Sequence, residues 1–441
     1  MHTSTLREWW RPDLPEAETP AATWSDAGEV VGGRLAFASL VAFTLILFTA
    51  PQERIPALAA LRIALLAGVT AFISYWVDRM LTTRPAPPRS LEVRLVYALV
   101  AWAGLTLPFS LWPGGSVETL NEYVKAVLVF WLIGATLLTV GRLRLMAWTL
   151  SLASMPLAVT AILNYGAGVY DDGRVTGYQS GIAENPNDLA LTLNIVLPLT
   201  AALLWSARTL FTRLALVGII AFNTAGVIVT FSRGGFLTLL VIVALLTLRL
   251  LRGRGVMAGV AVLVALLAAM PLLPEGYLDR LATIGDVESD PTGSSQDRWR
   301  DTTAAAGLLL EHPVMGVGLG QDVLALNEVR GETWKNVHNI YLQYGVDLGL
   351  IGMGLFVAML VLSIRGARRV EREGRGHADP DRQDLAMLAG AVRIGLLAFA
   401  VAGLFHPVAY YFYFYYLAGL AVAVQRTAAM SATNPAPVRS P

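Results

Sequence analysis

Hydrophobic residues of this chain gather in long runs that are separated by shorter polar segments. A helix needs about 20 predominantly apolar residues to cross the hydrocarbon core of a bilayer. Runs of this kind lie at residues 34–50, 57–77, 95–112, 122–140, 145–164, 186–205, 214–231, 235–251, 255–273, 338–364, 386–405 and 407–425. The pattern predicts an all-α polytopic membrane protein with about 12 transmembrane helices.

The polar segments divide the chain further. The longest of them, 274–337, is predicted to be a loop outside the membrane, and its stretch 297–312 has the composition of a short helix that stops at Pro313. The expected organisation is an N-terminal tail at 1–33, transmembrane helices 1–9 within 34–273, the loop at 274–337, transmembrane helices 10–12 within 338–425 and a C-terminal tail at 426–441.

Composition supports a membrane protein and excludes several other classes. Charged residues make up 15% of the chain, whereas a soluble domain carries about 25%. The net charge of +1 gives no indication of a nucleic-acid partner. The chain has no cysteine, which excludes disulfides and thiolate metal sites. The glycine-rich turn at 316–320 lacks the lysine of a phosphate-binding loop, so nucleotide binding is not expected.

The distribution of arginine predicts the orientation of the helices. Arginines are frequent in the polar segments at 79–94, 142–144, 208–213, 249–254 and 365–382. The short loops on the opposite side contain only Arg54, Arg174 and Arg233. Cytoplasmic loops carry the excess of basic residues in membrane proteins. Both termini are therefore predicted to be cytoplasmic, and the loop at 274–337 is predicted to lie on the outer face.

Polar residues at the predicted outer boundary are candidates for a functional site. Asn185 precedes Pro186 and suits the cap of a helix. A helix start alone does not explain Asn187 and Asp188, because unpaired polar groups near lipid are costly. Lys125, at the outer end of the fourth predicted helix, is a weaker candidate for binding phosphate.

Three arginines near the outer face are candidates for binding an anion. Arg233 lies in the short connection Ser232-Arg-Gly-Gly and is held at the interface, where it could also simply extend toward lipid headgroups. A guanidinium fork suits a phosphate better than a lysine does. Arg298 and Arg300 are two residues apart and cannot share one helix face, so one of them is expected to face the site.

His338 and Asn339 stand where the polar loop meets the tenth predicted helix. A single histidine at a helix start is more often structural than catalytic. The alternative role is that of a general base, which a neutral imidazole can perform near neutral pH.

Four motifs in this order make the chain similar to the O-antigen ligase/polymerase superfamily of bacterial envelope glycosyltransferases. They are Asn185-Pro-Asn187-x-x-Ala190, Ser232-Arg233-Gly234, Arg298 followed by His312-Pro313 and Gly316-Val-Gly318-x-Gly320, and His338-Asn339-x-Tyr-Leu-Gln with Asp347. The resemblance covers roughly residues 185–360. The single large outer loop before His338 and the strength of the last motif favour a ligase.

The resemblance implies a GT-C-like fold in the bacterial inner membrane, with the active site on the periplasmic face. It implies transfer of O-antigen from undecaprenyl diphosphate to the lipid A–core oligosaccharide, in lipopolysaccharide biosynthesis, with inversion and without a metal or another cofactor. His338 would be the general base, and Arg233 and Arg298 would bind the diphosphate. Substrate-binding roles would fall to Arg300, Asn185, Asn187, Asn339 and Lys125.

Two other functions are kept open by the sequence. An O-antigen polymerase would use the same chemistry with a second lipid-linked glycan as the acceptor. A transporter of lipid-linked glycans would place its ionisable residues near the middle of the bilayer. In this chain they cluster at the outer boundary, which disfavours transport.

Overall fold

The structure is a computed structural model of the 441-residue chain. It describes residues 33–82, 90–170, 174–178, 181–183, 185–251, 257, 259–260, 274, 277, 293–331 and 334–433. Most of the predicted N-terminal tail and most of the predicted helix at 255–273 lie outside the described residues.

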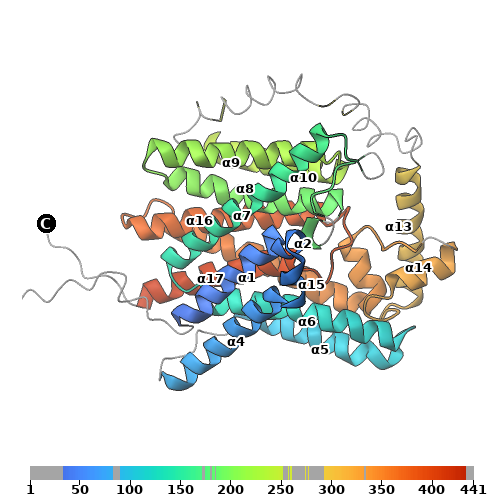
Figure 1. Cartoon of the computed structure of the whole chain (residues 1–441). Helices are drawn as coiled ribbons and strands as arrows, with labels where there is room; N and C mark the ends of the chain where they lie inside the picture. The colour runs from blue at the N-terminus through green and yellow to red at the C-terminus, as the bar shows by residue number, and fades with distance from the viewer. Residues whose placement is uncertain are drawn as a thin grey trace, which may run out of the picture.

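The described residues form helices and no strand, and each predicted apolar run outside 255–273 coincides with a helix (Figure 1). The helices are α1 (Arg34–Thr49), α2 (Pro51–Arg54), α3 (Pro56–Ala60), α4 (Ile63–Leu81), α5 (Leu91–Thr106), η1 (Leu107–Phe109), α6 (Pro113–Thr136), α7 (Val140–Gly166), η2 (Gly181–Ala183), α8 (Pro186–Ser206), α9 (Leu210–Val229), α10 (Arg233–Leu251), α13 (Ser294–Glu311), α14 (Asp322–Arg330), α15 (Ile340–Gly374), α16 (Pro380–Ala402) and α17 (Phe412–Thr433). Eight helices of the described part are long and apolar enough to cross a membrane. The chain is therefore an all-helical multi-pass membrane protein.

The centre of the bundle is α8, which packs against α7, α9, α10 and α16. Nearly all of its residues from Leu189 to Leu203 are buried. The α15 helix packs against α5, α16 and α17, and α6 packs along α17. The two helices of the polar loop, α13 and α14, lie together at one end of the bundle beside α15 (Figure 1).

The α15 helix is broken at Gly349, and the break fastens the polar loop to the bundle. Gly349 has a φ of 68°, and a Cβ there would overlap the carbonyl oxygen of Val314. The backbone N–H groups of Val317 and Gly318 donate to α15 carbonyls at 2.8 and 3.0 Å, and the Trp102 indole donates to the carbonyl of Leu348 at 2.9 Å. Backbone groups at the break are thereby satisfied inside the protein, as burial requires.

Several predicted boundaries differ from the helices observed, and two of the differences fall in the last part of the chain. The tenth predicted helix starts at 338, but α15 starts at Ile340, because Asn339 takes an extended conformation and caps the helix. Its Oδ1 accepts the backbone N–H groups of Tyr341 and Leu342 at 3.0 and 3.2 Å. His338 therefore lies in the loop that precedes the helix. At the other end of the chain, α17 continues past residue 425 to Thr433.

A group of ion pairs lies at the end of the bundle opposite α13 and α14. The buried carboxylate of Glu371 accepts from Arg375 and Arg393, each at 2.7 Å, and lies 3.7 Å from Arg249. Arg144 on α7 pairs with Asp384 on α16. Arg144, Arg249 and Arg375 belong to the segments that the sequence predicts to be cytoplasmic, and each is paired with a carboxylate.

Candidate functional site

His338 lies in an extended segment between α14 and α15, and that segment is held in place by Asp322. The backbone N–H of Val337 donates to Asp322 Oδ2 at 2.8 Å, and the Asn336 side chain donates to both carboxylate oxygens at 3.3 and 3.4 Å. On the other side of His338, the backbone N–H of Ile340 donates to the carbonyl of Gly403 at 2.7 Å. The backbone on each side of the histidine is therefore fixed.

Asp322 is fixed in turn by Asp347, and both side chains are fully buried. Asp347 Oδ1 accepts the backbone N–H of Asp322 at 2.8 Å, while its Oδ2 accepts the hydroxyl of Tyr410 at 2.8 Å. Burial raises the pKa of the Asp322 carboxyl. Asp347 thus reaches the histidine segment through Asp322 rather than by touching the imidazole. The sequence motif contains Asp347 but gave no indication of Asp322.

The imidazole of His338 is partly buried, and its Nδ1 has no hydrogen-bond partner among the described residues. Burial and the positive charge of Arg298 lower the pKa of His338 to about 4, although the backbone carbonyl of Asn336 acts in the opposite direction. The ring is therefore neutral near pH 7 and can accept a proton.

Arg298 lies on α13, and its charge also lowers the pKa of His406, although burial is the larger cause there. The neighbouring acidic residues bind other partners. Asp301 accepts from Arg330 at 2.7 Å, and Asp297 lies 3.7 Å from Lys335. These ion pairs tie α13 to α14 and to the segment that leads to His338. Arg300 is exposed on α13.

Arg233 begins α10 and connects it to the start of α13. Its Nη1 donates to Ser295 Oγ at 2.8 Å, one turn before Arg298. The preceding residue, Ser232, donates from its hydroxyl to Asn187 Oδ1 at 2.7 Å. The position of Arg233 is therefore set by contacts to both α8 and α13.

His406 lies in the connection between α16 and α17, next to the residues that position Arg233. It is 1% exposed, with Nε2 3.0 Å from the carbonyl oxygen of Asn187 and Nδ1 3.0 Å from that of Ala402. A Cβ added at Gly234 would lie 3.5 Å from its Cε1. His406 thus packs between α8, α10 and α16. In the sequence, its only signal is that it is a single histidine between the apolar runs at 386–405 and 407–425.

The other candidates of the sequence analysis have different surroundings. Asn185 caps α8, accepting backbone N–H groups at 3.0 and 2.9 Å, and its amide contacts Asp188. Asn339 caps α15. Lys125 pairs with Glu122 at 2.5 Å on α6. The structure brings Arg233, Arg298, His338 and Asn187 to one end of the bundle, and we call the part that carries the two arginines the arginine side.

A large cleft opens next to the segment that carries His338. It is formed by α6, the first turn of α8, the start of α14, residues 334–336 and residues 410–413, and it encloses about 2270 Å³, including the part open to solvent. Among the described residues, the charged side chains that line it are all acidic: Glu118, Glu122, Asp188 and Asp322. Its aromatic lining consists of Trp112, Trp334, Tyr410, Tyr411, Phe412 and Tyr413. We call it the acidic cleft.

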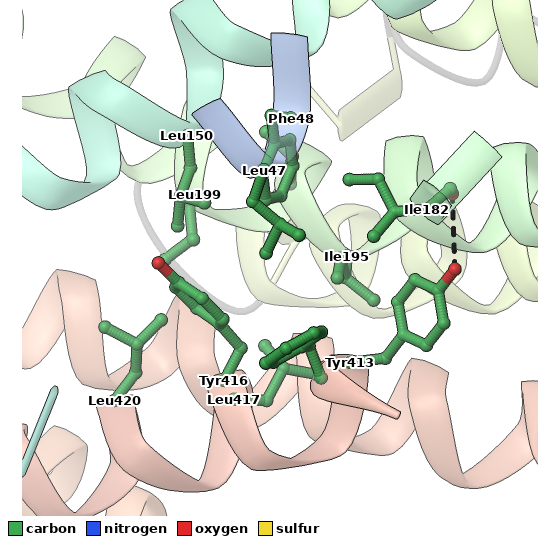
Figure 2. Close-up of a pocket in the computed structure, with 12 residues that line it drawn as sticks. Leu47, Phe48, Leu150, Ile182, Ile195, Leu199, Tyr413, Tyr416, Leu417 and Leu420 are labelled. Carbon is green, nitrogen blue, oxygen red and sulfur yellow. Dashed lines mark hydrogen bonds between the residues drawn. The ribbon is translucent and has the colours of Figure 1, made fainter. Parts of the chain in front are cut away.

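An apolar pocket continues from the acidic cleft toward the interior of the bundle. Figure 2 shows it between α1, α7, α8 and α17, lined by apolar and aromatic side chains. Its volume is about 400 Å³. The two cavities share Leu47, Ile182, Phe412 and Tyr413. The Tyr413 hydroxyl donates to the carbonyl of Ile182 at 3.2 Å, so it is bound at the boundary between them (Figure 2).

Comparison with known proteins agrees with the resemblance found in the motifs. Residues 215–357 match the family model described as O-Antigen ligase. The match runs from α9 into α15 and includes Arg233, Arg298 and His338. Comparison with curated proteins gave no match. Within the described residues, no cluster of three or more His, Asp or Glu side chains could hold a metal ion. The similarity of this membrane protein to the O-antigen ligase family thus covers residues 215–357.

Proposed function

We propose that the protein is an O-antigen ligase that transfers a glycan from undecaprenyl diphosphate to the lipid A–core oligosaccharide. The observation that carries this proposal is the placement of Arg233 and Arg298 at the same end of the bundle as a neutral, partly buried His338. A lipid diphosphate is already a stable anion when it leaves, so its departure needs positive charge more than it needs a proton.

The two arginines would bind the diphosphate of the donor. Guanidinium groups form charge-assisted hydrogen bonds that can be bidentate to phosphate oxygens. As the bond between the anomeric carbon and the diphosphate breaks, negative charge grows on the leaving oxygen, and fixed positive charge stabilises it. This arrangement needs no metal ion, and we propose that the reaction is metal-independent.

His338 would act on the acceptor. The acceptor hydroxyl forms a bond to the anomeric carbon and gives its proton to the imidazole, which later releases the proton to water. Direct displacement inverts the anomeric configuration. When the diphosphate lies against Arg298, its negative charge offsets the guanidinium, and the pKa of His338 rises. The base therefore becomes stronger once the donor is in place.

The remaining features of the proposal concern the membrane. We propose about 12 spans in a GT-C-like arrangement, both termini in the cytoplasm, and the active site on the periplasmic face of the inner membrane. Asn185, Asn187 and Asn339 would shape the site mainly through the helix starts and contacts described above. Arg300 and Lys125 would meet substrate only at its edge, because Arg300 is exposed and Lys125 is paired with Glu122.

The decisive experiment is reconstitution of the purified protein in lipid vesicles with an undecaprenyl diphosphate-linked glycan. Lipid A–core and a second lipid-linked glycan are offered in separate reactions, each with and without EDTA. We expect transfer to lipid A–core that EDTA leaves unchanged. Transfer only to the lipid-linked glycan would identify a polymerase, and no transfer to either acceptor would contradict the proposed function.

A further inference from the structure

The ring of His406 makes two contacts that a neutral histidine cannot satisfy together. It is 1% exposed and has no part in the proposed chemistry. Its Nδ1 lies 3.0 Å from the carbonyl oxygen of Ala402, and its Nε2 lies 3.0 Å from that of Asn187. Carbonyl oxygens only accept hydrogen bonds, so each contact requires an N–H on that nitrogen. A neutral ring has one N–H and satisfies one contact, whereas the charged ring satisfies both.

The contact with Asn187 joins two distant parts of the chain, and the contact with Ala402 does not. The carbonyl of Ala402 lies four residues before the histidine and already accepts the backbone N–H of Phe405 at 2.9 Å. Asn187 belongs to the first turn of α8, and its Oδ1 accepts the hydroxyl of Ser232 at 2.7 Å. Because Ser232 directly precedes Arg233, the bond from Nε2 is the one that can set the position of the arginine.

The ring of His406 also packs against the start of α10. A Cβ added at Gly234, the residue after Arg233, would lie 3.1 Å from Phe405 Cβ and 3.5 Å from Cε1 of His406. The connection between α16 and α17 thus lies close to the backbone of α10. His406 is held to α8 by a hydrogen bond and to α10 by packing, so it lies between the two helix starts that carry Asn187 and Arg233.

The same connection holds the segment that carries His338. The backbone N–H of Ile340 donates to the carbonyl of Gly403 at 2.7 Å, and a Cβ at Gly403 would lie 2.6 Å from Ile340 Cγ2. Burial, Arg298 and His406 all lower the pKa of His338, so the two histidines are within electrostatic reach of each other. This short connection therefore contacts the arginine side and the segment of the base at once.

We propose that His406 is a positioning residue of the reaction centre, which uses the bond from Nε2 to Asn187 to hold the arginine side at a fixed separation from His338. This inference rests on the proposed function, in which Arg233 binds the donor diphosphate and His338 is the base. The diphosphate leaves the same anomeric carbon that the acceptor hydroxyl attacks, so a shift of about 1 Å between the two groups slows transfer. His406 is buried and acts on substrate only through Asn187 and Ser232.

The test replaces each ring nitrogen separately. The amide nitrogen of glutamine can take the place of Nε2 and that of asparagine the place of Nδ1, so His406→Gln keeps a donor for Asn187 and His406→Asn keeps one only for Ala402. In the transfer assay, His406→Asn should lower kcat and raise KM for the donor about 10-fold, as expected for the loss of one hydrogen bond. His406→Gln should retain most of the activity. Asn223→Ala, which removes a buried amide that binds Ser154, is the control for lost stability and should leave KM for the donor unchanged.

Hydrogen–deuterium exchange of the full-length protein in lipid nanodiscs measures the contact without any reaction. His406→Asn should speed exchange of the backbone N–H groups of Gly235 and Phe236, which donate to Ser232 Oγ and to its carbonyl at 3.1 and 2.9 Å, and His406→Gln should not. Equal exchange and equal KM in the two variants would overturn the proposal. Faster exchange in His406→Asn with an unchanged KM for the donor would also overturn it, because the contact then serves stability alone. A wild-type protein that transfers nothing would overturn the ligase proposal instead, and the exchange rates would still decide whether Nε2 holds the start of α10.

Discussion

The arginine side and the acidic cleft are neighbours, and they share the first turn of α8. Asn185 faces the cleft, while Asn187, half a turn on, accepts a hydrogen bond from Ser232 next to Arg233. A ligase must hold two large lipid-linked saccharides at once and keep them in the correct order. Under the proposed function, the arginine side would bind the donor diphosphate, and His338 at the same end of the bundle would act on the acceptor.

The two regions also differ in how they are held. The arginine side is positioned by contacts among α8, α10 and α13, with His406 buried behind them. The histidine segment at the edge of the cleft depends on two buried carboxylates, Asp322 and Asp347. Changes on the arginine side should therefore affect the donor, and changes in the carboxylate pair should affect the geometry of the base.

The largest effect is expected from His338→Ala, which removes the proposed general base. General bases contribute about 10²- to 10⁴-fold to a rate, and kcat should fall by that order while both substrates still bind. His312→Ala, at an exposed histidine on the end of α13, is the matched control and should retain full activity. Retention of more than a tenth of kcat by His338→Ala would contradict the assigned role.

The second effect concerns the support of the histidine segment. Asp322→Ala leaves the buried N–H of Val337 and the amide of Asn336 without their partner, at a cost of about 1–3 kcal/mol for each group. We expect a lower melting temperature and loss of transfer, measured on the detergent-purified protein. Asp379→Ala, which removes a helix cap at the opposite end of the bundle, should lower stability without selective loss of transfer. If Asp322→Ala behaves like this control, the carboxylate does not position the base.

The third effect tests whether the arginine side belongs to the donor. Arg233→Lys keeps the charge but loses the guanidinium fork, so kcat/KM for the donor should fall about 10-fold or more, as expected for the loss of one charge-assisted hydrogen bond. Arg365→Lys, at an exposed arginine on α15, should have no effect. If Arg233→Lys leaves kcat/KM for the donor unchanged, the diphosphate is not held by bidentate contacts to Arg233. If only KM for the acceptor changes, the arginine side binds the acceptor and not the donor.

The smallest effect is a shift in the pH dependence of transfer. The base must be neutral to accept a proton, and the pKa of His338 is about 4, so kcat/KM should be level from pH 6 to 8 and fall as the pH approaches that value. Arg298→Gln removes a cause of the lowered pKa, so the acidic limb of kcat/KM should move to higher pH, in addition to any loss of rate. Arg300→Gln should leave the limb where it was. The reverse result would assign Arg300, and not Arg298, to the histidine.

Much of the fold could be predicted because the interior of a bilayer restricts the backbone to a few structures. Apolar runs long enough to span a bilayer must form helices, since their backbone groups have no other partners, and the predicted run at 186–205 became α8 with its cap at Asn185 as expected. The resemblance to the ligase family was also confirmed. The start of α15 was placed two residues early, because hydrophobicity does not reveal that Asn339 is a cap.

The parts of the site that could not be predicted depend on contacts between distant residues. Nothing in the local sequence indicates that Asp322 binds the N–H of Val337, or that His406 lies against Asn187, more than 200 residues away along the chain. The acidic cleft likewise arises only when α6, α8, α14 and residues 410–413 come together. Roles for His338, Arg233 and Arg298 were expected from motifs and remain predictions.

The link from Tyr410 to Asp347 has a consequence for biosynthesis. A ribosome delivers α15 to the membrane well before it has made the connection between α16 and α17, so the carboxylate pair first exists without its hydroxyl donor and without the carbonyl of Gly403 that binds Ile340. The segment that carries His338 therefore reaches its final position only after the last two helices have been inserted. A nascent or truncated chain that ends before residue 403 should be an inert membrane protein, and its glycosyl transfer activity should begin only when synthesis is nearly complete.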